Sequence, residues 1–95
     1  MKEEVIMILS DAINLRIQEL LKEHQLTAYK LSYLAGISNS IISDCKRGKV
    51  KELSISSVIH ICEGLNMELK DFFDSKYFKE VEAIDRLEKR EPKVV

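Results

Sequence analysis

Residues 27–48 read TAYKLSYLAGISNSIISDCKRG, and this stretch organises the rest of the 95-residue chain. It predicts two short helices joined by a tight turn. Thr27 and Ser38 are suited to cap the two helices, because a hydroxyl accepts a hydrogen bond from an unpaired amide of the first turn. Gly36 lies where the chain must turn through a left-handed conformation, which glycine adopts without steric cost. The order of cap, helix, glycine turn, cap and helix, ended by Gly48, is typical of a helix-turn-helix unit.

Apolar residues recur in this stretch at spacings of three and four, which places them on one face of each helix. The expected inward-facing residues are Ala28, Leu31, Leu34 and Ala35 in the first helix, and Ile41, Ile42 and Cys45 in the second. After a loop, Ser54 is expected to cap a further helix whose core-facing residues are Ile55, Val58, Ile59, Cys62 and Leu65. Another helix is expected at residues 68–73. The pattern predicts a compact helical bundle around the motif.

These residues resemble the helix-turn-helix of the Cro and phage-repressor (XRE) regulators. The positions that carry the resemblance within the motif are Leu26, Thr27, Leu31, residues 35–38, Ser40, Ile42, Ser43 and residues 47–49. The resemblance continues through residues 54–55, 58–62 and 65–73, so that it covers roughly residues 11–74. It implies an all-α, compact five-helix repressor-like domain that binds double-stranded DNA.

In such a motif the second helix, expected here at residues 38–47, enters the major groove and meets base edges. The base-reading residues that the resemblance implies are Asn39, Ser40, Ser43 and Asp44. Asn39 is the strongest candidate, because its amide can pair bidentately with adenine. For Asp44 two roles stay open: it accepts from a cytosine amino group, or it repels phosphate. The expected contacts to the sugar-phosphate backbone are Thr27, Tyr29, Lys30, Ser38, Lys46, Arg47, Lys49 and Lys51.

The distribution of charge supports the same assignment. A net charge of −1 does not by itself point to nucleic acid. Residues 27–51, however, carry five of the chain's 15 cations and one of its 16 anions, a net charge of +4, so the remaining residues carry −5. The positive charge is therefore gathered on the motif and the loop after it, where a phosphate backbone would lie.

Both ends of the chain are predicted to be helical. Hydrophobic spacing predicts a helix throughout residues 3–24, and residues 1–10 are interpreted as an N-terminal helical extension. The Ser-Asp pair at residues 10–11 offers the alternative of a fresh helix start there. The DNA-binding domain is assigned to residues 1–74, and residues 75–95 are predicted to be an extra, charged C-terminal helix and tail. An isolated charged helix of this length is marginal, so the terminal helices are expected to cover each other, a second subunit or a protein partner. For the N-terminal helix the alternative is that it only completes the core of its own domain.

Other classes of protein find little support in the sequence. Two cysteines without a C-x-x-C spacing, and no paired histidines, give neither a disulfide framework nor a zinc site, so no metal and no cofactor are expected. No catalytic constellation is recognisable, and the chain is not expected to be an enzyme. The apolar run at residues 5–9 is far shorter than a membrane span, and a cytoplasmic location is expected. A redox switch at Cys45, beside Lys46 and Arg47, is an alternative to a core role, because cations lower the pKa of a thiol.

The leading hypothesis is a repressor-like transcriptional regulator that binds double-stranded DNA sequence-specifically, as a homodimer on a pseudo-palindromic operator. Two positions depart from the family's pattern: Ala28 stands where a glutamine is common, and Asp44 where a basic residue is frequent. Together with the near-neutral total charge, they motivate the alternative of a protein-interaction module, for example an antitoxin-like partner. Such a module would keep the fold with weak or no DNA binding.

Overall fold

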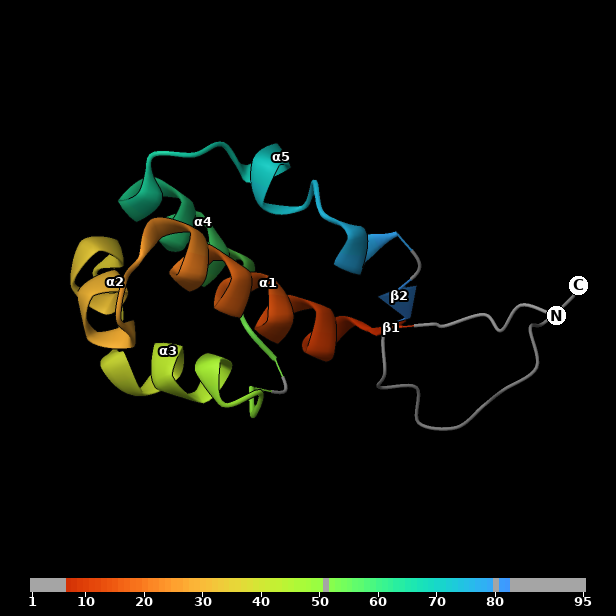
Figure 1. The fold of residues 1–95 in the computed structure, drawn as a ribbon, viewed down its shortest axis with the longest axis horizontal. Coiled ribbons are helices and arrows are strands. Elements are labelled where there is room, and N and C mark those ends of the chain that lie inside the picture. Colours follow the sequence, from red (N-terminus) through yellow and green to blue (C-terminus); the bar gives the residue numbers. More distant parts are fainter. Residues whose placement is uncertain (1–6, 51, 80, 83–95) are drawn as a thin grey trace, which may run out of the picture.

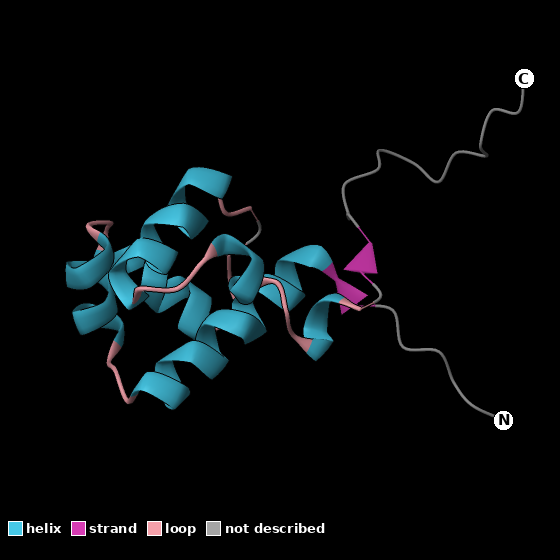
Figure 2. Ribbon diagram, turned by 90° about the horizontal axis from the view of Figure 1, so that it is seen from above, coloured by secondary structure: helices cyan, strands magenta, loops and turns pink. Residues whose placement is uncertain are grey.

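The computed structural model describes residues 7–50, 52–79 and 81–82 of the chain. Its α-helices are α1 (Leu9–His24), α2 (Ala28–Ala35), α3 (Asn39–Lys46), α4 (Ile55–Leu65) and α5 (Leu69–Phe72), followed by the 3₁₀ helix η1 (Lys76–Phe78). Two short strands, β1 (Met7–Ile8) and β2 (Val81–Glu82), pair in parallel. Figure 1 shows α1 crossing the molecule, with α2 and α3 at one end and the strands at the other. Figure 2, seen from above, shows the two strands at one end of the helical part. The predicted all-α, five-helix fold is confirmed, with this two-residue pairing added to it.

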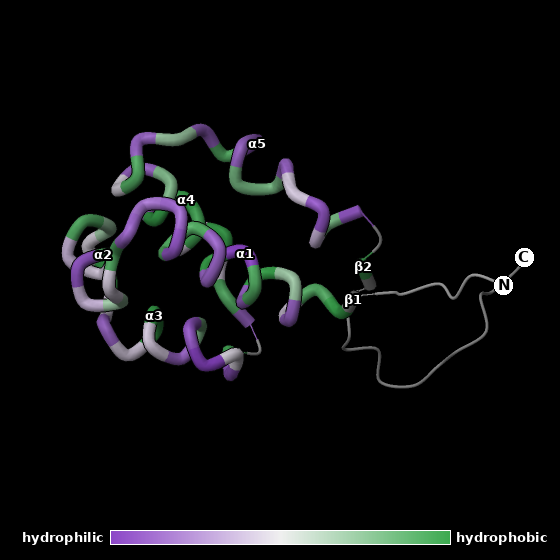
Figure 3. Tube along the Cα trace, viewed as in Figure 1, coloured by the Kyte–Doolittle hydropathy of each residue, from purple (hydrophilic) through white to green (hydrophobic). Residues whose placement is uncertain are grey.

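The hydrophobic core gathers side chains from all five α-helices. Its largest fully buried members are Phe72, Ile17, Leu20, Leu31, Ile42, Ile61, Val58 and Cys45. α2 packs against α3 and α4, and α1 packs against α3. The traces of α1 and α3 alternate between hydrophobic and hydrophilic residues in Figure 3, as expected of helices that bury one face. The two motif helices are therefore held by the core rather than by each other alone.

Three residues expected to face the core are exposed instead. Leu34 of α2 is 41% exposed, and Ile55 and Ile59 of α4 are 57% and 39% exposed. Ile61, which the predicted set for this helix lacks, is fully buried. Because Val58 and Ile61 define the buried face of α4, the side chains at 55 and 59 lie toward its edge. The predicted burial of Val58 and Cys62 is confirmed, whereas the prediction that Ile55 and Ile59 face the core is wrong.

The prediction of one long helix from residue 3 is wrong at the described residues 7–8, which form β1. Ile8 has an extended backbone (φ −76°, ψ 140°), and α1 begins only at Leu9. Pairing of Ile8 with Glu82, and of Met7 with Val81, favours the extended form here, since the segment is apolar and tertiary pairing overrides local helix propensity. Residues 1–6 of the predicted helical extension lie outside the described residues.

The predicted C-terminal helix is also wrong where the structure describes it. Residues 76–78 form the single 3₁₀ turn η1 and residues 81–82 form β2, while residues 83–95 lie outside the described part. Phe78 packs against the core, with its ring centroid 4.9 Å from that of Phe73 and 6.1 Å from that of Phe72. Through this aromatic cluster, η1 packs against the core and lies beside α1, so the folded domain continues beyond residue 74.

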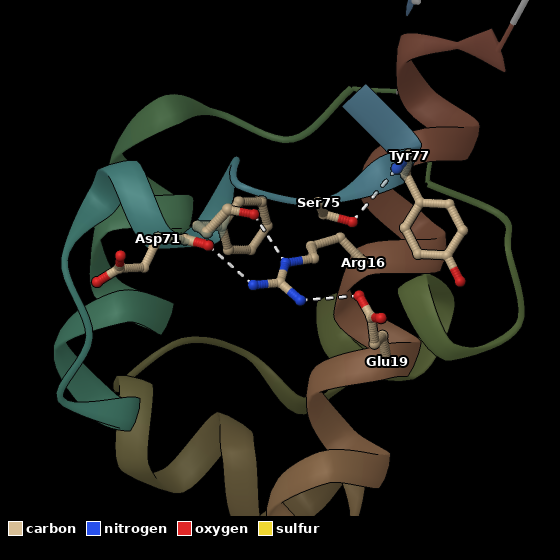
Figure 4. Close-up of polar contacts among 6 residues, drawn as sticks. Arg16, Glu19, Asp71, Ser75 and Tyr77 are labelled. Carbon is tan, nitrogen blue, oxygen red and sulfur yellow. Dashed lines mark hydrogen bonds and ion pairs between the residues drawn. The ribbon is translucent and has the colours of Figure 1, made fainter. Parts of the chain in front are cut away.

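A buried arginine joins α1 to the end of α5. Arg16 is only 7% exposed, and its guanidinium donates to the carbonyl oxygens of Phe72 (2.7 Å) and Asp71 (2.8 Å) and to the carboxylate of Glu19 (2.7 Å), as Figure 4 shows. The two carbonyls lie at the C-terminal end of α5, where a positive charge is favoured. Sequence reasoning assigned Arg16 no role, because two of its three partners are backbone carbonyls more than 50 residues away.

A glycine allows α4 to lie directly against the end of α2. A Cβ atom on Gly64 would lie 2.8 Å from the carbonyl carbon of Leu34 and 2.9 Å from the amide nitrogen of Ala35. Real side chains do not approach backbone atoms so closely, and only glycine fits without a shift. The contact fixes the end of α2, just before the turn at Gly36 that leads into α3.

Candidate DNA-binding surface

The first motif helix begins as predicted, with a hydroxyl cap. The Thr27 hydroxyl accepts from the amide of Lys30 (3.0 Å), and Gly36 ends α2 in the left-handed conformation (φ 72°). Ala28 is 8% exposed and belongs to the core cluster. Tyr29 and Lys30 are exposed beside it. The start of α2 therefore presents a capped helix N-terminus, a phenol and an ammonium group to solvent, a combination suited to phosphate.

The second motif helix, which is expected to read DNA, matches its predicted bounds when its caps are included. The Ser38 hydroxyl accepts from the amide of Ser40 (3.1 Å), α3 runs over Asn39–Lys46, and Arg47 is its C-cap. Ile42 and Cys45 form the inward face of α3 and are fully buried. Asn39 and Ser40 are exposed and Ser43 is half-buried. The N-terminal, outward face of α3 thus combines short polar side chains with a rigid, core-packed base.

Asp44 and Arg47 are ion-paired, which sequence reasoning did not anticipate. The Arg47 guanidinium lies 2.9 Å from the Asp44 carboxylate, one helical turn away. Both side chains are exposed, at 60% for Arg47 and 45% for Asp44, and exposed pairs of this kind contribute only about 0–1 kcal/mol. Arg47 can therefore exchange Asp44 for a phosphate group at little cost in free energy. Without DNA, Arg47 partly neutralises the negative charge of Asp44.

Cations gather where the chain leaves α3. Lys46, Arg47 and Lys49 are exposed, and Gly48 turns the chain with a φ of 74°. Lys51, the remaining predicted backbone contact, lies outside the described residues. The structure thus brings the described cations of the exit segment to one end of α3, with the exposed start of that helix at the other.

Two residues of α1 that sequence reasoning missed hold this exit segment. The Gln18 amide donates to the carbonyl of Cys45 (3.1 Å), and the Asn14 amide donates to the carbonyl of Val50 (3.0 Å). Their sequence signal is weak, because an Asn and a Gln on an amphipathic helix are ordinary surface residues. Asn14 differs from an ordinary surface residue in one respect: it is a polar residue on the buried face of α1, where it is 2% exposed.

The structure contradicts the redox alternative at Cys45. The side chain is fully buried, and burial, with a further contribution from the charge of Asp44, raises the pKa of the thiol from 9.0 to about 11. The neighbouring cations point to solvent and do not lower it. Burial likewise raises the pKa of Cys62. Both cysteines are free and buried, and they are protonated, unreactive core residues at neutral pH.

The residues that the structure describes contain neither a candidate metal site nor a candidate membrane-spanning helix. Among them, no three side chains of His, Cys, Asp or Glu are grouped so that they could hold a metal ion. In the same residues, no helix has both the length and the apolar character that a membrane crossing requires. His24 ends α1 beside Lys22, and His60 lies on the exposed side of α4, 3.6 Å from Glu63.

Comparison with known protein families identifies the domain. The model of the Cro/C1-type HTH DNA-binding domain matches residues 16–76, more than half of the chain, and includes the motif, α4, α5 and the C-terminal part of α1. Comparison with curated proteins and with solved structures gave no significant match. The family is a type of DNA-binding regulator rather than of enzyme, which supports the general part of the functional hypothesis. The chain therefore belongs to the Cro/C1-type helix-turn-helix DNA-binding family.

Proposed function

We propose that this protein is a cytoplasmic, repressor-like transcriptional regulator that reads duplex DNA with α3 in the major groove. The observation that carries the proposal is the outward face of α3, on which polar side chains stand over a fully buried base of Ile42 and Cys45. A helix held rigidly in this way presents its first residues to base edges at a fixed depth. The proposed base-reading residues remain Asn39, Ser40, Ser43 and Asp44.

The proposed contacts to the sugar-phosphate backbone come from the starts of the two motif helices and from the segment that follows α3. They are Thr27, Tyr29, Lys30, Ser38, Lys46, Arg47, Lys49 and Lys51. Support comes from two kinds of group: the N-termini of α2 and α3, whose first amides favour anions, and the cations after α3, which attract phosphate without regard to sequence. Such contacts set the register of the protein on DNA, whereas the base contacts set the preferred sequence.

The proposed mechanism is occupancy by a dimer. Two copies related by a two-fold axis would place their α3 helices in successive major grooves, about 34 Å apart, on a pseudo-palindromic operator. A bound dimer then blocks or recruits the polymerase. The symmetry of the operator mirrors that of the protein, so the half-site spacing reports the geometry of the dimer.

The test is the salt dependence of duplex binding, measured by fluorescence anisotropy for single substitutions. Arg47→Ala should weaken binding to all duplexes and lower the slope of log K against log[salt] by about 1, because one phosphate contact is lost. Asn39→Ala should instead relax the preference for one sequence with little change in the slope. The matched control is Lys70→Ala: this exposed cation lies on α5, on the other side of α1 from α3 (Figure 1), and its loss should change neither quantity.

Two results would contradict the proposal. If Arg47→Ala and Lys70→Ala altered the salt slope equally, the cations after α3 would not be the phosphate-binding set. If Asn39→Ala left the preferred sequence unchanged, the assignment of Asn39 as a base reader would be wrong.

A further inference from the structure

Two side-chain amides of α1 hold both ends of the cationic segment that follows the recognition helix. Gln18 Nε2 donates to the carbonyl of Cys45 (3.1 Å), and Asn14 Nδ2 donates to the carbonyl of Val50 (3.0 Å). The two amides are four residues apart, and therefore lie on one face of α1. Between their acceptors lie residues 46–49, with three exposed cations.

The bond from Gln18 acts on the turn that ends α3. The Cys45 carbonyl also accepts from the amide of Gly48 (2.9 Å), and the amide of Lys49 reaches the carbonyl of Asp44 (2.8 Å). A Cβ atom on Gly48 would lie 3.9 Å from Gln18 Nε2, so the side-chain amide lies directly against this turn. Gln18 therefore adds a side-chain hydrogen bond to a turn that already has two backbone hydrogen bonds.

The bond from Asn14 fixes the far end of the segment. Asn14 is 2% exposed, and its Oδ1 has no hydrogen-bond partner among the described residues. Its neighbours Ile13 and Ile17 belong to the core. A buried amide oxygen without a partner lowers stability, so an apolar side chain at this position would serve the core better. What the Asn14 amide provides, and an apolar side chain would not, is the hydrogen bond to the Val50 carbonyl.

We propose that Asn14 and Gln18 are positioning residues for DNA binding, which hold residues 46–50 in their bound arrangement before DNA is present. The cations of this segment then meet phosphates in a single register, and the register fixes how α3 faces the bases. A preformed segment also avoids the entropy loss of ordering at the moment of binding. The proposal rests on the proposed DNA-binding function, and it assigns part of the sequence specificity to two side chains held away from DNA.

The test compares two duplexes, one carrying the preferred sequence and one with that sequence scrambled. Asn14→Leu and Gln18→Met keep the size of the side chain and remove the donor. Each should weaken binding to the preferred duplex about tenfold, while binding to the scrambled duplex stays within about twofold, because loosened cations still reach phosphates without setting the register. Arg47→Ala, in contrast, should weaken binding to both duplexes. Glu23→Gln, an exposed change on α1, is the matched control and should alter neither.

Hydrogen exchange without DNA separates positioning from folding. In both donor-deleting variants the amides of Gly48 and Lys49 should exchange faster than in the unsubstituted protein, while amides in the core of α1 keep their protection. The melting temperature of Asn14→Leu should change little, since the removal of an unpaired buried oxygen offsets the loss of the donor to the Val50 carbonyl. A variant that is merely less stable would instead lose protection throughout and lose affinity for both duplexes equally, which would overturn the proposal.

The proposed function and the positioning role of the two amides are refuted by different results. If the unsubstituted protein bound both duplexes equally, the proposed function itself would be contradicted. If it discriminated between them, and the variants kept both this discrimination and the protection of Gly48 and Lys49, only the positioning role of the two amides would be refuted.

Discussion

Replacing Gly64 by alanine tests the close approach of α4 to the end of α2. The added Cβ would lie 2.8 Å from the Leu34 carbonyl carbon, 2.9 Å from its oxygen and 2.9 Å from the Ala35 nitrogen, all of them backbone atoms that cannot rotate away. Overpacking costs about 1–3 kcal/mol, and contact with three backbone atoms that cannot move away places this substitution in the upper part of that range, at about 2–3 kcal/mol. In a helix, glycine to alanine otherwise gains about 1 kcal/mol. We therefore expect a net loss of about 1–2 kcal/mol in the free energy of unfolding.

The assay is urea unfolding followed by circular dichroism, with the melting temperature as a second measure. A loss of this size should lower the melting temperature of a domain of this length by about 4–15 °C. Glu63→Ala, an exposed change at the neighbouring position, is the matched control and should stay within about 0.5 kcal/mol of the unsubstituted protein. If Gly64→Ala were as stable as the unsubstituted protein, or more stable, the helices would not be in close contact there and the reasoning would be refuted.

Two further predictions concern buried groups. Arg16→Met should lower the free energy of unfolding by about 3 kcal/mol, because the carbonyls of Asp71 and Phe72 lose a charged donor; a loss below about 0.5 kcal/mol in urea unfolding would contradict this role. Cys45 has a pKa of about 11 in the folded protein and 9.0 as its usual value. Since the unfolded chain releases this proton first, stability should be full below pH 9 and fall as the pH rises to 11. Cys45→Ala should show a smaller fall over that range in pH-dependent unfolding, and an equal fall would contradict the assignment.

The helix-turn-helix could be predicted because its signals are local. Thr27 and Ser38 cap helices that begin at the next residue, and Gly36 adopts the left-handed conformation that the turn requires. Each of these features depends on groups within a few residues in sequence, where hydroxyl caps and glycine turns have well-defined chemistry. The bounds of α2 and α3 follow from them.

The parts that could not be predicted depend on partners distant in sequence. β1 is extended because it pairs with β2, more than 70 residues later. Which side chains of α4 are buried depends on where α2 lies. The requirement for glycine at position 64 likewise arises only from its contact with the backbone of α2. Asn14 and Gln18 bind backbone carbonyls 36 and 27 residues away, and no sequence pattern marks the donor of such a bond. Local chemistry thus identified the candidate reading surface, but not the residues that hold it in place.

Selection from a random duplex pool at physiological salt tests the central claim most directly, because it asks whether the protein reads sequence at all. We expect an enriched, two-fold symmetric motif whose half-sites lie about 34 Å apart, one helical turn of DNA. The enrichment should be lost when the selection is repeated with Asn39→Ala. A pool that shows no enriched sequence after repeated rounds, from a protein shown to be folded, would contradict sequence-specific regulation by this domain.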